Sequence, residues 1–197
     1  MTKATVEQDR DSEQRSRLLT LTVDYLEQHG FAGFSLRPLA AAIGTSPRML
    51  VYWFGSKDGL IRMIAEEVQR RESEWLSSPA AVSTAPGDLL EIALRRAIDP
   101  KKRNLQRLVL EMLVAALNDP KSHRELLDLL VYGLLEPIYS IEMRYESDPE
   151  RARSRARLAL AAVRGLQVDV LVTGDVRAAE DAIRELRCLI EEAKANR

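Results

Sequence analysis

The segment Ser35–Lys57 constrains the fold more than any other part of this sequence, because it predicts two short helices joined by a tight turn. Its first half places apolar side chains at the spacing of one helix face. These side chains are Leu36, Leu39, Ala40 and Ile43. Gly44 then supplies the turn, since a residue without a Cβ adopts a positive φ at little steric cost.

The residues after this turn predict the start of a second helix. Thr45 and Ser46 carry hydroxyls that can cap it, and Pro47 suits its first turn, where the missing N–H loses no bond. Leu50 and Phe54 lie four residues apart and turn back onto the first helix. Arg48, Met49 and Tyr52 lie on the other sides of this second helix. This division of faces is typical of a helix-turn-helix, in which the second helix enters a DNA major groove.

The composition of the chain indicates an all-α globular protein. Of its 197 residues, 46% are hydrophobic and 30% are charged, which is typical of a chain that buries a core. Glycine and proline are sparse, and strand-like alternation between turn signals is hard to find. The chain begins with the charged run MTKATVEQDRDSEQR, which lacks the apolar segment of a signal peptide. No apolar run approaches the roughly 20 residues that span a bilayer, so we expect a cytoplasmic location.

The charge of the chain is unevenly distributed. The total is −1, but residues 14–57 contain five basic and two acidic side chains, so that the remainder sums to −4. The basic ones are Arg15, Arg17, Arg37, Arg48 and Lys57, and the acidic ones are Asp24 and Glu27. A modestly basic segment on an acidic body is what a phosphate-binding domain produces, although a solvated helix face can also show it.

The pattern of helix signals predicts about nine helices in three regions. Residues 1–13 are expected to form a flexible N-terminal arm, residues 14–57 the helix-turn-helix domain, and residues 58–197 a second helical domain. Residues 77–88 are rich in Ser, Pro and Ala and predict a linker. The helices are expected at about 14–28, 35–42, 46–52, 58–76, 89–98, 103–117, 121–143, 149–173 and 176–195, with a kink or break near Pro137.

Residues that could carry out catalysis or hold a metal are scarce. The two histidines, His29 and His123, lie far apart, and His29 beside Gly30 predicts a capping or solvated position. The single cysteine, Cys188, excludes an intramolecular disulfide, and its surroundings predict a small buried apolar group. Phosphate-binding glycine loops and nucleophile motifs are absent from the sequence. We therefore expect no enzyme, no metal site and no cofactor.

Residues 15–65 contain a set of short motifs, which are His29-Gly30-Phe31, Leu39-Ala40, Gly44, Leu50-x-x-x-Phe54 and Ser-Lys-Asp-Gly-Leu at 56–60. With these motifs the segment resembles the TetR family of bacterial repressors. The resemblance implies a three-helix DNA-binding domain, with a support helix at 35–42 and a recognition helix at 46–52. The rest of the chain matches only in size and helicity. Val51 stands where the family commonly has Tyr, and Thr45 stands where it often has Val.

Several side chains of this domain are candidate DNA contacts. Arg48 can donate two hydrogen bonds to guanine O6 and N7, which is worth about 1–3 kcal/mol of discrimination, and a phosphate or solvent contact is the alternative. Met49 and Pro47 can touch a thymine methyl, unless Met49 packs in the core. Tyr52 is expected at a phosphate, and the resemblance implies the same for Lys57.

The remaining candidates surround these positions. Ser35, Thr45 and Ser46 can present hydroxyls or helix-terminal N–H groups to the DNA backbone. Trp53 either braces the fold with its indole N–H facing DNA or covers Leu36. The complete set of candidate DNA-binding residues is Ser35, Arg37, Thr45, Ser46, Pro47, Arg48, Met49, Tyr52, Trp53 and Lys57.

The last two helices are candidates for pairing two copies of the chain. A reader domain of this size contacts few base pairs, so specificity normally comes from two copies on a palindrome. Gly165 sits inside a predicted helix at a cost of about 1 kcal/mol relative to Ala, which a close neighbour would explain. The candidate interface residues are Ala162, Gly165, Leu166, Leu186, Leu189 and Ile190. A dimer of this kind is also implied by the resemblance, and closure of the monomer core is the alternative.

The middle helices would then surround a small-molecule pocket. Glu111 lies inside the apolar run LVLEMLVAAL, so it must be paired, pocket-facing or at an interface. The apolar character of this region favours a hydrophobic effector. We therefore expect a homodimeric, ligand-responsive repressor that binds a double-stranded palindromic operator and is released by a small-molecule effector. A helical protein-interaction module without DNA binding is the alternative.

Overall fold

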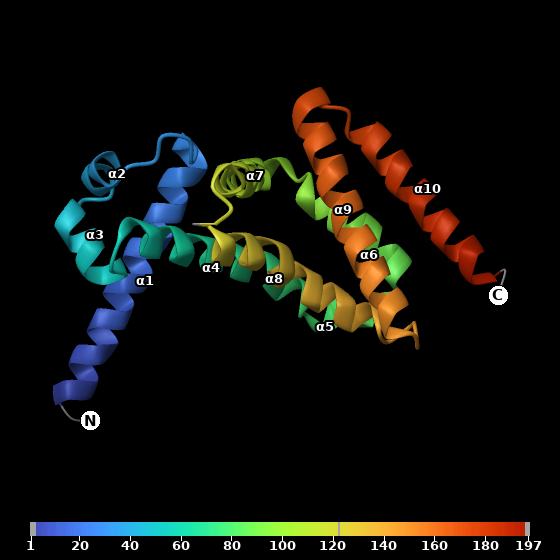
Figure 1. Ribbon diagram of the computed structural model, residues 1–197, viewed down its shortest axis with the longest axis horizontal. Helices are drawn as coiled ribbons and strands as arrows, with labels where there is room; N and C mark the ends of the chain where they lie inside the picture. Colours follow the sequence, from blue (N-terminus) through green and yellow to red (C-terminus); the bar gives the residue numbers. More distant parts are fainter. Residues whose placement is uncertain (1–2, 122, 196–197) are drawn as a thin grey trace. The chain divides into compact units, whose positions relative to one another are not determined.

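The computed structural model describes the backbone of residues 3–121 and 123–195, and side chains within residues 10–192 apart from 72 and 122 (Figure 1). Ten α-helices and one 3₁₀ turn account for its regular structure, and no strand occurs among these residues. The predicted all-α fold is confirmed. The elements are α1 (Lys3–His29), α2 (Leu36–Ala42), α3 (Pro47–Phe54), α4 (Lys57–Leu76), α5 (Pro79–Ser83), α6 (Pro86–Ala97), η1 (Pro100–Lys102), α7 (Arg103–Asn118), α8 (Arg124–Glu142), α9 (Pro149–Thr173) and α10 (Val176–Ala195).

The first helix is longer than predicted. We expected a flexible arm over residues 1–13, but α1 runs without interruption from Lys3 to His29. Residues 3–13 contain no glycine or proline and several good helix formers, so nothing in them opposes helix formation. A helix therefore stands where the sequence predicted an arm, and residues 1–2 lie outside the described part.

The predicted linker over residues 77–88 contains an additional helix. Ser78 accepts a hydrogen bond from the backbone N–H of Ala81 at 3.2 Å, and Pro79 occupies the first turn of α5. This cap starts a short helix in a segment whose composition suggested a linker, and it explains why there are ten helices rather than nine.

The three C-terminal helices follow the predicted order with one difference. α8 begins at Arg124 and continues past Pro137 to Glu142, so the break that we considered near this proline does not occur. α9 and α10 begin and end at the predicted residues. Asp148 caps α9 by accepting a hydrogen bond from the N–H of Glu150 at 3.0 Å.

The chain forms two compact units. The first comprises the chain up to Arg70 together with Arg107–Leu130, and the second comprises Arg71–Gln106 and the chain from Val131 onward. Helices α4, α7 and α8 therefore each contribute residues to both units. The predicted boundary between the helix-turn-helix domain and the second helical domain, at residues 57/58, stays a prediction. The first boundary between the compact units lies further along the chain, at Arg70 within α4.

In the first unit, α1 contributes one buried face to the core. Leu18 and Leu26 of α1 are buried, and so is Thr22, whose hydroxyl donates to the carbonyl of Leu18 at 2.7 Å. After α1, Phe31 is buried and its ring stacks on Phe34 with 5.6 Å between centroids. The buried Phe31 and the half-buried Phe34 thus pack against each other in the loop between α1 and α2.

In the second unit, α6, α9 and α10 pack against one another (Figure 1). Their shared core is built around four buried residues, which are Leu90, Leu94, Ala179 and Ile183. Nearby, the buried side chains of Gln106 and Gln167 satisfy each other through a hydrogen bond of 2.5 Å. Because a buried amide without a partner is costly, this pair fixes how α7 and α9 meet inside the unit.

A charged cluster joins α6 to α10 at the surface of the second unit. Arg187 donates hydrogen bonds to Glu91 and Glu191, each at 2.9 Å, and forms an ion pair with Asp88 at 2.6 Å. The hydrogen bonds to Glu191 and Glu91 hold the pKa of Arg187 above its usual value. Cys188, the neighbouring residue, is exposed rather than buried as predicted, because α10 turns it away from this packed side.

Candidate nucleic-acid interface

Helices α2 and α3 form the helix-turn-helix expected from the sequence. Gly44 has a φ of +71°, the turn conformation for which glycine is suited. The N–H of Thr45, the next residue, donates to the carbonyl of Ala40 at 2.8 Å. The side chains that pack the two helices are all buried, and they are Leu39, Ala40, Leu50 and Phe54. One face of α3 therefore packs in the core of the helix-turn-helix, and its other faces remain exposed or half-buried.

The start of α3 is capped by one of the predicted hydroxyls. Ser46 accepts a hydrogen bond from the N–H of Met49 at 3.2 Å, and Pro47 begins the helix. Thr45 is half-buried in the turn. Ser35 stands at the equivalent position before α2, but its exposed hydroxyl makes no capping bond. The two serines therefore differ, since only Ser46 uses its side chain to start a helix.

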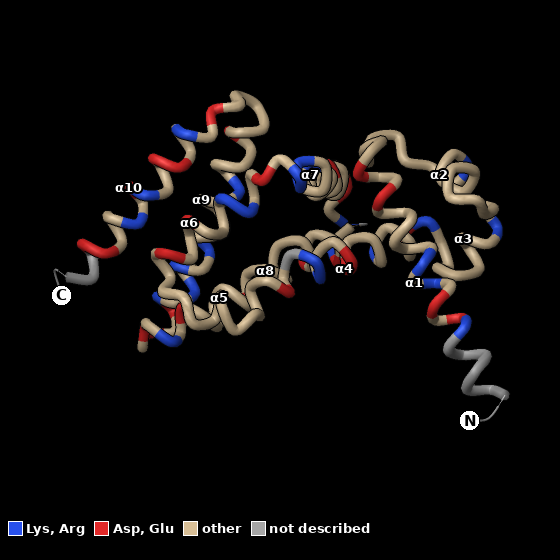
Figure 2. Tube along the Cα trace, turned by 180° about the vertical axis from the view of Figure 1, so that it is seen from behind, with Lys and Arg blue, Asp and Glu red and all other residues tan. Residues whose placement is uncertain are grey.

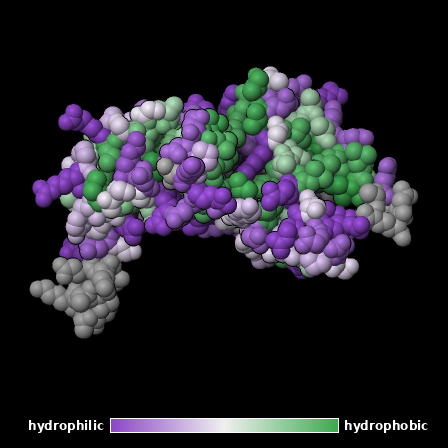
Figure 3. Space-filling model, in the orientation of Figure 1, coloured by the Kyte–Doolittle hydropathy of each residue, from purple (hydrophilic) through white to green (hydrophobic). Residues whose placement is uncertain are grey.

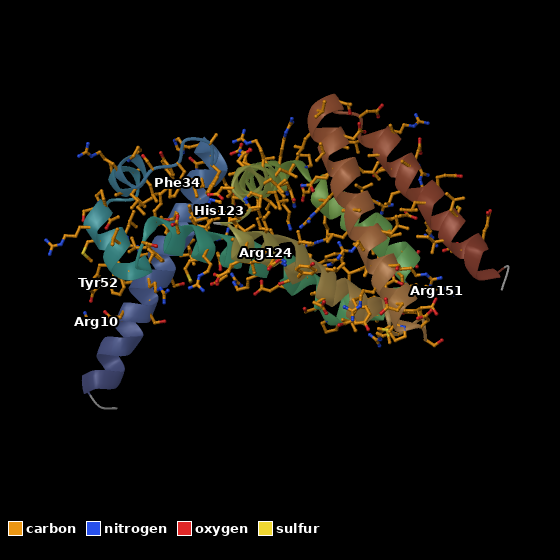
Figure 4. The ribbon with its side chains drawn as sticks, viewed as in Figure 1. Arg10, Phe34, Tyr52, His123, Arg124 and Arg151 are labelled. Atoms are coloured by element: carbon orange, nitrogen blue, oxygen red, sulfur yellow. The ribbon has the colours of Figure 1, made fainter. Side chains whose placement is uncertain are left out.

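The outward face of α3 carries the predicted contact residues. Arg48 is exposed and makes no hydrogen bond or ion pair with any described residue. Met49 is 40% exposed, so it does not pack in the core. Tyr52, labelled in Figure 4, is 69% exposed. Val51 is 41% exposed on the same helix. The helix thus presents a cation, an aromatic hydroxyl and apolar surface together.

Trp53 has a different environment from the one predicted for a DNA contact. Its side chain is half-buried, and its indole N–H is shielded from solvent without a hydrogen-bond partner among the described residues. Its ring meets that of Tyr52 edge-on, with centroids 5.0 Å apart. The N–H is therefore enclosed in this structure, and a contact of Trp53 with DNA stays a prediction. Trp53 supports the ring of Tyr52.

The electrostatic character of this surface comes from the absence of acidic residues. Between Glu27 and Asp58 the sequence contains no Asp or Glu, and Figure 2 shows α2 and α3 without any red segment. The basic side chains in this stretch, Arg37, Arg48 and Lys57, are all exposed. Cations that no carboxylate neutralises are the groups that attract a phosphate backbone.

Arg15 belongs to the same basic segment but has another role. Its guanidinium lies over the ring of Phe54, 5.9 Å from the centroid, and donates to the sulfur of Met63 at 3.6 Å. This side chain therefore packs α1 against α3 and α4.

Glu111 connects α7 to the loop that precedes α2. Its carboxylate accepts a hydrogen bond from the backbone N–H of Phe31 and forms an ion pair with Arg107 at 3.3 Å. The sequence predicted that this glutamate must be paired, in a pocket or at an interface, and the pairing is confirmed. The sequence did not indicate the partner, because Phe31 lies 80 residues away.

The predicted pairing residues of α9 and α10 divide into two groups. Gly165 and Leu189 are exposed. The other four pack partly against the core of the second unit, and they are Ala162, Leu166, Leu186 and Ile190. The exposed apolar side chains of α9 instead include Leu158 at 47%, Val168 at 41% and Val172 at 80%. These residues share a face with Gly165 because positions 158, 165, 168 and 172 are spaced by seven, three and four residues.

Figure 3 shows hydrophobic side chains over α9 and α10 on the visible surface. Isolated exposed apolar residues need no explanation, but a continuous helical stripe indicates a contact surface.

Neither a metal site nor a membrane-spanning helix is found among the described residues. No group of His, Cys, Asp and Glu side chains is arranged to hold a metal ion there. Among the same residues, no helix combines the length and the apolar character needed to cross a membrane.

Part of this sequence matches a known protein family, and the fold is similar to that of solved structures. Residues 18–64 match the family model described as bacterial regulatory proteins, tetR family. None of the curated proteins matches the sequence. A solved transcriptional regulator from Rhodococcus sp. Rha1 is similar in fold, with a TM-score of 0.74 and 21% identity over 91% of this chain and 96% of that one.

Two further structures are similar over most of their length. A TetR transcription regulator from Haloarcula marismortui gives a TM-score of 0.68 at 18% identity, covering 92% of this chain and 98% of that one. The multidrug binding protein EbrR, solved with imidazole, gives a TM-score of 0.68 at 22% identity, and the match covers 89% of this chain and 88% of that one. At these identities the likeness shows the fold, which extends through both compact units.

Proposed function

Because this chain belongs to the TetR family of bacterial regulatory proteins, we propose that it is a homodimeric transcriptional repressor that binds a palindromic operator. The observation that carries the proposal is the outward face of α3. This face exposes Arg48 and Tyr52 on a short helix, within a stretch free of carboxylates. An exposed helix face of this kind fits a DNA major groove, where cations and hydrogen-bond donors meet bases and phosphates.

The side chains of the reader domain take different roles in the proposal. Arg48 reads a guanine, whereas Tyr52 and Lys57 bind phosphates and set the position of the helix. Met49 and Pro47 contact a thymine methyl. The hydroxyls and the remaining cation approach the DNA backbone from Ser35, Arg37, Thr45 and Ser46. Trp53 acts indirectly, by supporting the ring of Tyr52.

Two copies of the chain pair through the exposed face of α9, with α10 beside it. Gly165 lies in the middle of this face and lets a partner helix approach closely, while Leu158, Val168 and Val172 supply apolar area. A symmetric pair of readers spaced about one DNA turn, ~34 Å, would match a palindrome.

A small-molecule effector releases the repressor from DNA. An effector that binds more tightly to a dimer with another reader spacing shifts the population away from the DNA-bound form. The structurally similar EbrR is a multidrug binding protein solved with imidazole, and the apolar middle helices favour a hydrophobic ligand here. The site of action is the cytoplasm, where the bacterial chromosome lies, and the role is regulatory rather than enzymatic.

A selection from random double-stranded DNA with the purified full-length chain tests the proposal. We expect enrichment of a palindrome, with binding that weakens steeply as salt rises. Arg48→Ala combined with Tyr52→Ala should abolish specific binding, whereas Lys57→Gln should weaken all sequences alike and lower the salt slope by about one.

The matched control is Arg177→Ala combined with Tyr145→Ala, because both residues are exposed in the second unit and lie outside the predicted interface. This variant should bind as the wild type does. Failure to enrich any sequence would overturn the proposal and favour a protein-interaction module.

A further inference from the structure

The first unit contains a groove of about 680 Å³ between the loop before α2, the start of α4 and the middle of α7. This volume lies within the range of small-molecule sites. All the lining residues belong to the first unit. Phe34 and His123, labelled in Figure 4, line it from the loop and from the segment before α8. The groove therefore adjoins the reader domain itself.

The floor of the groove is apolar. Ile61 of α4 and Leu126 of α8 are buried at its base, and Leu110 of α7 is half-buried beside them. Val114 also lines it and leaves 60% of its side chain exposed. Figure 3 shows hydrophobic side chains over α7 on the visible surface. Such a floor binds the apolar body of a ligand, because covering it removes hydrocarbon surface from water.

The charged side chains of the groove leave one cation available. Arg107 and Glu111 form an ion pair, and Glu111 also accepts the N–H of Phe31. The ammonium of Lys57 lies 5.4 Å from the centroid of the Phe34 ring, and no described carboxylate pairs with it. A ring face attracts a cation but leaves its N–H donors unused, so Lys57 can still donate to an anion.

None of the other described polar groups at the rim forms an ion pair with Lys57. Asp58 lies in the first turn of α4, where the N-terminal end of the helix favours its negative charge, and it is exposed. Asn118 and His123 provide further hydrogen-bonding groups at the edge. The groove thus combines an apolar floor, one available ammonium and a partly polar rim.

From this arrangement we propose that the groove binds a small amphipathic carboxylate, with its apolar body on Ile61, Leu110 and Leu126 and its carboxylate at Lys57. This inference rests on the proposed function in one respect: Lys57 is also the expected phosphate contact. A lysine that is bound to a ligand carboxylate cannot also neutralise a DNA phosphate. A ligand in this groove therefore opposes DNA binding locally, without any change in the spacing of the two readers.

The test uses the full-length chain with methyl-labelled Ile, Leu and Val side chains, observed by NMR without DNA. The probe is 4-phenylbutyrate, and the uncharged control is 4-phenylbutyramide. We expect saturable shifts at the methyls of Ile61, Leu110 and Leu126, with a dissociation constant below about 1 mM. The amide, or the Lys57→Gln variant with the acid, should bind roughly tenfold more weakly, because a charge-assisted hydrogen bond is lost.

A pair of tryptophan variants separates the groove from the rest of α7. Val114→Trp fills the groove and should abolish binding of the acid. Leu117→Trp is the matched control, because Leu117 is 61% exposed on the same helix but does not line the groove. The methyl spectrum itself reports whether each variant is folded.

Two results would overturn the groove proposal: equal binding of acid and amide, or shifts that persist in Val114→Trp. The absence of any saturable binding would also overturn it. None of these measurements involves DNA, so they are independent of the operator selection. If the chain binds the acid but selects no DNA, the groove proposal stands and the repressor proposal is overturned. If the chain selects DNA but does not bind the acid, the repressor proposal stands and the groove proposal is overturned.

Discussion

Helices α3 and α9 each bury one face and expose the other, but their exposed faces differ in chemistry. α3 exposes Arg48 and Tyr52 in a stretch without acidic residues. α9 exposes Val168 and Val172 around Gly165. Burial alone explains how each helix packs in its own unit. The exposed chemistry separates a surface suited to a polyanion from one suited to a second copy of the chain.

The two helices also differ in how clearly the sequence marks the buried side. In α3 the buried Leu50 and Phe54 are large, and the opposite positions are polar or flexible. In α9 both sides carry small or aliphatic residues, such as Ala162 on the core side and Ala161 on the exposed side. A helix with two apolar faces needs two neighbours, and the core of the second unit supplies one of them.

The largest expected effect comes from placing charge on the exposed face of α9. Val168→Glu combined with Val172→Glu should raise the dissociation constant of the proposed dimer at least about a hundredfold, because twofold symmetry brings like charges together. Sedimentation equilibrium measures this constant. Val114→Glu introduces the same change at an exposed valine of the first unit and should leave the dimer intact. A dimer that survives the double substitution would place the contact elsewhere.

The buried face of α3 should respond next most strongly. Leu50→Ala removes a side chain that is 1% exposed and should destabilise the reader domain by about 2–5 kcal/mol. Urea unfolding followed by Trp53 fluorescence, in a Trp75→Phe background, measures this loss. Val51→Ala, at the adjacent exposed position, should stay within about 0.5 kcal/mol. Equal losses at both positions would contradict the assignment of faces.

A smaller effect is expected where the reader domain meets α7. Gly30 has a φ of +81°, and a Cβ there would stand 3.0 Å from a carboxylate oxygen of Glu111. Gly33 has a φ of +72° with open space around its Cα. Both alanine variants should lose about 1 kcal/mol through backbone strain, and Gly30→Ala should lose more because it crowds Glu111. Urea unfolding of the two variants side by side provides the measurement, and identical midpoints would argue against a constrained contact at Glu111.

The smallest difference is expected between two serines that precede helices. Ser46→Ala removes the cap of α3 and should cost about 1 kcal/mol. Ser35→Ala should cost less, because its hydroxyl makes no capping bond in the structure. Thermal unfolding of both variants, with Ser46→Asp as a rescue that restores a capping oxygen, measures the difference. A larger loss at Ser35 than at Ser46 would reverse the assignment of caps.

Local signals predicted most of the fold correctly. The turn at Gly44, the pair Leu50 and Phe54, and the bounds of α9 and α10 all follow from interactions among residues close in sequence. Such interactions depend on caps, helical spacing and side-chain size, which can be seen in a short window of sequence. The errors at residues 3–13 and at α5 came from reading composition as a substitute for those local signals.

Contacts between distant segments could not be predicted in the same way. The sequence showed that Glu111 needs a partner but not that the partner is the N–H of Phe31. It showed an apolar stripe on α9 and α10 but not that Leu166 and Leu186 face the core. It also placed Cys188 inside, whereas the rotation of α10 exposes it.

The sequence by itself determined a helical chain with a DNA-reader motif, because helical period, caps and the lack of carboxylates across α2 and α3 are properties of neighbouring residues. Only the tertiary structure decided which apolar side of α9 stays exposed and which charges of the groove are already paired. Those outcomes depend on the rotation of each helix about its axis and on partners many residues away. Lys57 illustrates the division: the sequence marks it as a cation beside the reader, and its neighbours in space place it at an apolar groove.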